Sequence, residues 1–122
     1  MKLITFYAAF LLLAGITLLF APNEIGALTS QTAAGHALFV QLLGAAFIGF
    51  AASNWIVRHS PVGGIYGRAV VIGNLAFSIV GALALLGSFP AEPGLGFWML
   101  LAILAAGSVL HSVLLFRGPQ DR

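Results

Sequence analysis

The sequence predicts an all-α membrane protein, an antiparallel four-helix transmembrane bundle whose N- and C-termini are both cytoplasmic. Composition, charge-free stretches and the placement of cations all support this. Of the 122 residues, 61% are hydrophobic and only 7% are charged, whereas about 25% are charged in a typical soluble domain. A soluble fold needs a charged surface, so lipid is the expected solvent. The length allows one domain, residues 1–122.

Four stretches are long enough to cross a bilayer as helices, which takes about 20 apolar residues. They lack Asp, Glu, Lys, Arg and Pro, and they cover residues 3–21, 37–57, 69–89 and 97–116. The links between them contain Pro and Gly, which interrupt helices. The first stretch follows a lysine as in a secretory signal, but its apolar run is longer than the 7–15 residues of such signals. We therefore interpret it as the first span.

The cations predict the orientation. They occur in the N-terminus, the second link and the C-terminus, which alternate onto one side: Lys2, Arg58, Arg68, Arg117 and Arg122. The links of the other side carry Glu24 and Glu92 and no cation. The positive-inside rule places the cationic side in the cytoplasm, which predicts a multi-pass protein of the bacterial inner membrane. The cations fix topology, and near the membrane they suit anionic lipid headgroups.

Small residues predict how the helices pack. Lipid provides no hydrophobic drive between helices, so small side chains must allow their backbones to approach closely. In the second stretch, small or polar residues recur every four positions, and the third stretch has a similar face. The expected packing positions are Gln41, Gly44, Ala45, Gly49 and Gly81.

A layer of polar residues is expected roughly 5–8 Å below the cytoplasmic boundary, from a helical rise of about 1.5 Å per residue. Its members are Tyr7, Asn54, Asn74, His111 and Ser112. Polar groups inside a bilayer are costly unless they are paired. One interpretation is a small binding site, with His111 as the titratable group and the two asparagines as orienting groups. The other is a structural network of interhelical hydrogen bonds, worth about 0.6 kcal/mol each.

Several chemistries are excluded or disfavoured. The absence of cysteine excludes disulfides, thiol catalysis and Cys-based metal sites. The predicted spans contain no carboxylate for a proton- or cation-coupled exchanger, and His36 and His111 fall at opposite ends, which argues against bis-histidine haem. Five dispersed cations do not form a nucleic-acid surface. We therefore predict no catalytic residue, metal or cofactor.

Three segments resemble a known group: LFAPNEIG after the first span, QLLGAAFIG within the second, and SNWIVR at its inner end. The chain is similar over its whole length to uncharacterised small four-helix bacterial integral membrane proteins gathered as domains of unknown function, including the DoxX-like group. The resemblance implies the fold and assigns no site residue. Small multidrug-resistance transporters need a Glu in the first helix, and small fluoride channels need a Thr- and Ser-rich break in the third. Both features are missing here.

Two functions remain open at this point. Abundant packing surface and few reactive groups favour a non-enzymatic accessory or assembly subunit, which binds a second copy or a larger membrane protein through its small-residue faces. The alternative is a small-molecule or ion binder or carrier that uses the polar layer.

Overall fold

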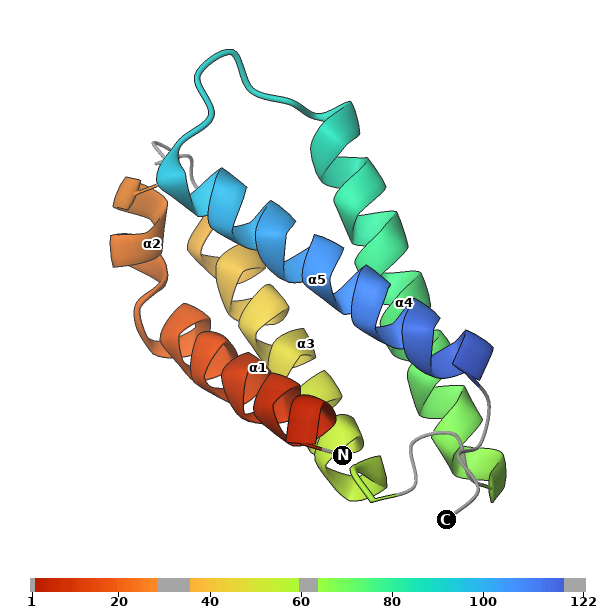
Figure 1. Ribbon diagram of the computed structural model, residues 1–122. Coiled ribbons are helices and arrows are strands. Elements are labelled where there is room, and N and C mark those ends of the chain that lie inside the picture. The colour runs from red at the N-terminus through yellow and green to blue at the C-terminus, as the bar shows by residue number, and fades with distance from the viewer. Residues whose placement is uncertain (1, 29–35, 60–63, 118–122) are drawn as a thin grey trace.

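The computed structural model describes residues 2–28, 36–59 and 64–117, which form five helices and no strand (Figure 1). Four of the helices are long and apolar enough to cross a membrane, with mean hydropathy between 1.6 and 2.4 over their spanning windows. The prediction of an all-helical chain with four such helices is confirmed. The helices are α1 (Lys2–Phe20), α2 (Pro22–Leu28), α3 (His36–Val57), α4 (Gly64–Gly87) and α5 (Leu95–Arg117).

The short helix α2 differs from the prediction, which treated its residues as part of a link. Pro22 starts this helix instead of preventing it, because proline lacks only an N–H that the first helical turn leaves unpaired in any case. Glu24 lies in the first turn, where a negative charge favours the positive end of the helix dipole. Helix α2 packs against α3 and touches α5 at one end of the bundle (Figure 1).

Helix α4 also differs, because it begins at Gly64 rather than at residue 69 and ends at Gly87. Glycine lowers helix stability by about 1 kcal/mol relative to alanine but keeps its backbone hydrogen bonds, so Gly67 did not end the helix as proline would. Arg68 therefore lies inside α4, where it is exposed, instead of in a link.

The helices associate as two pairs. Helix α1 packs most extensively on α3, and α4 packs on α5, whereas the two pairs contact one another more sparingly. In the first pair the backbones touch at Gly15 and Gly44: a Cβ added to Gly44 would lie 2.7 Å from the Gly15 carbonyl oxygen, and one added to Gly15 would lie 2.8 Å from the Gly44 carbonyl oxygen. Nearby, Gln41 Nε2 donates a hydrogen bond to the Leu19 carbonyl across 3.3 Å.

An apolar core joins the two pairs. Leu11, Phe47 and Ala51 are buried at its centre. Phe77 of α4 packs on two rings of α3, with its centroid 6.0 Å from that of Phe47 and 4.6 Å from that of Phe50. Aromatic pairs at these separations stabilise a core beyond their buried area alone, so this contact fixes α4 against α3.

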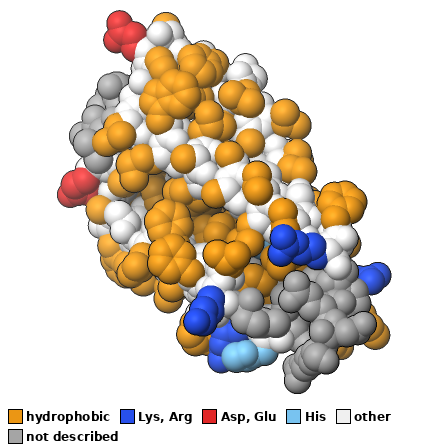
Figure 2. All heavy atoms as spheres, viewed as in Figure 1, with side chains coloured by type: hydrophobic (Ala, Val, Ile, Leu, Met, Phe, Trp, Pro, Cys, Tyr) orange, Lys and Arg blue, Asp and Glu red, His pale blue; other side chains and the backbone are white. Residues whose placement is uncertain are grey.

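The outer surface of the described residues is largely apolar, and hydrophobic side chains cover most of the visible face (Figure 2). Leu3, Phe6 and Ile65 are 71%, 75% and 87% exposed. Soluble monomers rarely expose continuous apolar surface on this scale. Acidic side chains lie toward one end and basic side chains toward the other (Figure 2).

Candidate functional site: a buried polar cluster

A cluster of polar side chains lies between the helices, away from solvent. We call it the polar cluster. Helices α1, α3 and α5 each contribute one residue and α4 contributes two: Tyr7, Asn54, His111, and Asn74 with Ser78. Four of these are almost fully buried, with exposed fractions of 1% for Asn54, 2% for Asn74, 1% for Ser78 and 0% for His111. Each long helix therefore contributes to one shared polar centre.

Helical periodicity places these groups on matching faces. Asn74 and Ser78 are one turn apart on α4, and Gly107 and His111 are one turn apart on α5, so each pair points in one direction. Buried polar groups must find hydrogen-bond partners, since an unpaired group costs about 1–3 kcal/mol. Their burial among apolar helices implies that the cluster largely satisfies itself.

Two asparagines bridge the helix pairs. Asn54 Nδ2 donates to the Asn74 side-chain oxygen over 2.7 Å and to the Phe50 carbonyl over 2.8 Å. Asn74 Nδ2 donates to the Val70 carbonyl over 2.9 Å. The side-chain bond ties α3 to α4, and the two bonds to backbone carbonyls hold each amide in place on its own helix.

His111 is in contact with three helices. Its Nδ1 lies 2.8 Å from the Gly107 carbonyl oxygen on its own helix, and its Nε2 lies 3.3 Å from Asn54 Oδ1 on α3. The Tyr7 ring of α1 meets the imidazole in a T-shaped arrangement, with the centroids 5.1 Å apart. The side chain therefore connects α5 to both helices of the first pair.

Gly107 makes room for two hydroxyl groups beside the imidazole. A Cβ at this position would lie 2.5 Å from the Tyr7 hydroxyl and 2.6 Å from Ser78 Oγ. Ser78 Oγ is buried and makes no hydrogen bond of normal geometry among the described residues. Ser78 was not among the residues expected in the polar layer, although its spacing of one turn from Asn74 was a usable signal.

Other predicted residues lie elsewhere. Ser112 is half-buried and takes no part in the hydrogen bonds of His111 and the asparagines.

On α3, Gly44 faces α1, but Ala45 and Gly49 are exposed, and a Cβ added to Gly49 meets nothing within 4 Å. The buried face of α3 contains Val40, Phe47 and Ala51 instead. The face with small or polar residues at every fourth position, which was expected to pack, therefore points away from the bundle at Ala45 and Gly49. A Cβ at Gly81 would lie 3.1 Å from the Leu104 side chain of α5, as expected for a packing position.

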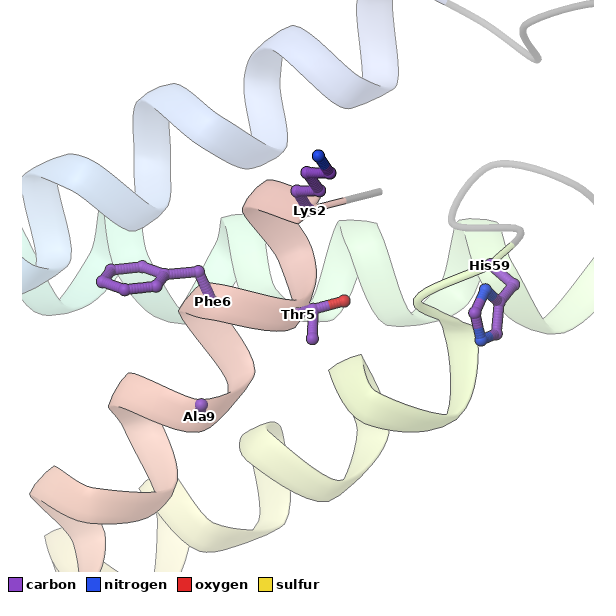
Figure 3. A pocket seen from close by; sticks show the side chains of 5 residues that line it. All are labelled: Lys2, Thr5, Phe6, Ala9 and His59. Atoms are coloured by element: carbon purple, nitrogen blue, oxygen red, sulfur yellow. The ribbon is translucent and has the colours of Figure 1, made fainter.

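The basic end of the molecule has its own contacts. Arg58 Nη1 donates to the Trp55 carbonyl over 2.6 Å, and its guanidinium carbon lies 4.2 Å from the centroid of the Trp55 ring. Lys2 and His59 border an open, mainly apolar hollow that Phe6 and Ala9 also line (Figure 3). Arg117 ends α5 and is exposed. These groups remain at the surface and do not join the polar cluster.

The chemistry available to the cluster is limited. The described residues contain no group of three or more His, Cys, Asp or Glu side chains that could hold a metal ion. What the cluster offers is amide and hydroxyl hydrogen bonding around one imidazole. No protein-family model, curated protein or solved structure matches the chain. The resemblance to the DoxX-like group therefore stays a prediction.

Proposed function

We propose that the chain is a multi-pass protein of the bacterial inner membrane, an antiparallel bundle of α1, α3, α4 and α5 with both ends in the cytoplasm. Basic residues at one end of the molecule and acidic residues at the other support this orientation (Figure 2). They are Lys2, Arg58, Arg68 and Arg117 on the basic side, and Glu24 and Glu92 on the acidic side. Cytoplasmic links are the ones enriched in Lys and Arg.

Single introduced cysteines test this orientation. The chain has no cysteine of its own, so no native thiol adds to the labelling. His59 and Ala91 are exposed and belong to opposite predicted sides. In spheroplasts, we expect a membrane-impermeant maleimide to label Ala91→Cys at once and His59→Cys only after lysis, since the reagent reaches only periplasmic thiols. The opposite pattern would reverse the orientation, and immediate labelling of both would contradict a spanning bundle.

Within this topology, the function best supported is that of a non-enzymatic accessory or assembly subunit. The observation that carries it is a side of α3 with small residues that is exposed in the described part of the chain. Ala45, Gly49 and Ala52 are exposed there, while Gly44 is already used by α1. Small residues permit close helix approach in lipid, so this side suits a helix from a second copy or from a larger membrane protein.

A bulky residue at Gly49 should prevent such an approach. We expect Gly49→Leu to reduce at least tenfold the recovery of higher-mass complexes by native mass spectrometry after purification in mild detergent. Gly73→Leu is the matched control, because Gly73 is also exposed with nothing within 4 Å of an added Cβ, but lies on α4. A wild-type protein that is monomeric and partner-free, or equal losses from both variants, would contradict the proposal.

The second candidate function is ion binding at the polar cluster. It is favoured by one specific observation: the hydrogen-bond donors and acceptors around His111 do not balance when the imidazole is neutral. Both of its ring nitrogens face oxygen acceptors.

A further inference from the structure

We propose that the polar cluster is a proton-binding site in which His111 Nε2 takes the proton and Asn54 Oδ1 accepts the resulting hydrogen bond. The inference rests on the second candidate function and identifies its ion. It does not depend on the exposed side of α3.

The first step is the orientation of the two amides. Asn74 Nδ2 faces the Val70 carbonyl, so the Asn74 oxygen faces Asn54. Asn54 must present its NH₂ group to that oxygen and to the Phe50 carbonyl. Reversing either amide would bring two oxygen acceptors to within about 2.9 Å of each other, with no hydrogen between them. The Asn54 oxygen is therefore the atom that faces His111.

The second step is the imidazole itself. Nδ1 faces the Gly107 carbonyl at 2.8 Å, and Nε2 faces Asn54 Oδ1 at 3.3 Å. A neutral imidazole has one N–H, whereas the protonated form donates from both nitrogens. The contact at Nδ1 is the shorter one, so in the neutral ring the N–H is on Nδ1. The lone pair of Nε2 then points at a lone pair of Asn54 Oδ1. One added proton turns this repulsive contact into a hydrogen bond.

The third step concerns the groups that face the ring from each helix. Helix α1 supplies the Tyr7 ring, which meets the imidazole in a T-shaped arrangement. Helix α3 supplies the neutral Asn54. The neutral Asn74 and Ser78 of α4 are buried nearby, Asn74 against Asn54 and Ser78 Oγ beside Gly107. Arg58 is folded over Trp55 and Arg68 is exposed on α4. Burial disfavours the added charge, while two charge-assisted hydrogen bonds favour it. The balance between the two decides how readily the proton binds.

Proton occupancy has a structural consequence. The bond from His111 to Asn54 joins α5 to α3, and so joins the second helix pair to the first. When the proton leaves, the same two atoms repel each other, while the Asn54–Asn74 bond between the pairs remains. The contact between the pairs is thereby coupled to the proton.

The test is nitrogen NMR of ¹⁵N-histidine protein in lipid nanodiscs. The chain has three histidines, so the double variant His36→Gln/His59→Gln leaves the His111 signal alone. Between roughly pH 8 and pH 4, the range in which histidine titrates when moderately perturbed, we expect both nitrogens to convert to the protonated signal. At the alkaline end we expect the proton to remain on Nδ1. A neutral ring throughout, or a neutral ring protonated at Nε2, would overturn the proposal.

A second variant tests the acceptor. Asn54→Leu removes the oxygen facing Nε2 and is expected to weaken proton binding roughly tenfold or more, the factor corresponding to one charged hydrogen bond. Ser53→Ala is the control, because the Ser53 hydroxyl donates to the Gly49 carbonyl of its own helix. Equal titration of both variants would overturn the role of Asn54. If the ring stays neutral but its signals shift with added Na⁺, K⁺ or Zn²⁺, the proton assignment fails while ion binding survives.

Discussion

Gly44→Ala is expected to lower the free energy of unfolding by about 2–3 kcal/mol, the upper part of the range for overpacked positions. The added methyl group would lie 2.7 Å from the Gly15 carbonyl oxygen, 3.0 Å from Leu18 Cβ and 3.0 Å from the Leu19 nitrogen. Two of these three atoms are backbone, so no side chain can rotate away to make room. Helices α1 and α3 must separate instead. Equilibrium unfolding in mixed micelles, followed by circular dichroism, measures the loss.

The matched control is Gly49→Ala on the same helix, where an added Cβ meets nothing within 4 Å. Alanine forms helix better than glycine by about 1 kcal/mol, so this variant should be as stable as the wild type or slightly more so. A Gly44→Ala protein with the wild-type midpoint would show that α1 and α3 do not touch at this glycine.

The sequence predicted the four long helices well because their signal is local and strong. A run of about 20 apolar residues without charge or proline has few structural solutions. The boundaries were less accurate at Gly64 and Pro22, where the same residue types can either begin or end a helix. Proline at a first turn and glycine within a stable helix both depend on neighbours that composition does not specify.

The polar cluster was only partly predictable. Equal depth along the helices grouped Asn54, Asn74 and His111, but depth does not give rotation about the helix axis. Ser112 was therefore included and Ser78 missed, although Ser78 faces the centre. Rotation also explains the face of α3: Gly44 and Ala45 are neighbours in sequence, but about 100° apart around a helix with 3.6 residues per turn. Only one of them can face α1.

Asn54→Leu is expected to destabilise the bundle by about 1–3 kcal/mol, the cost of leaving buried polar partners unpaired. This exceeds the average of about 0.6 kcal/mol for an interhelical hydrogen bond in lipid, because the buried Asn74 Oδ1 is left without its donor. The Phe50 carbonyl also loses a side-chain bond, and a protonated His111 loses the oxygen that accepts from Nε2. The same micelle unfolding experiment measures this loss.

The double variant Asn54→Leu/Asn74→Leu distinguishes two causes of this destabilisation: the burial of unpaired polar groups, and the loss of the contacts themselves. If burial of unpaired groups dominates, the double variant should cost less than the sum of the two single variants, since it removes the orphaned Asn74 oxygen as well. Ser53→Ala should cost little, because that hydroxyl donates to a carbonyl of its own helix. Additive losses from the two asparagines would mean that the 2.7 Å bond contributes no coupling. The polar cluster would then hold two independent amides, and the tie between α3 and α4 would fall to the aromatic contact of Phe77.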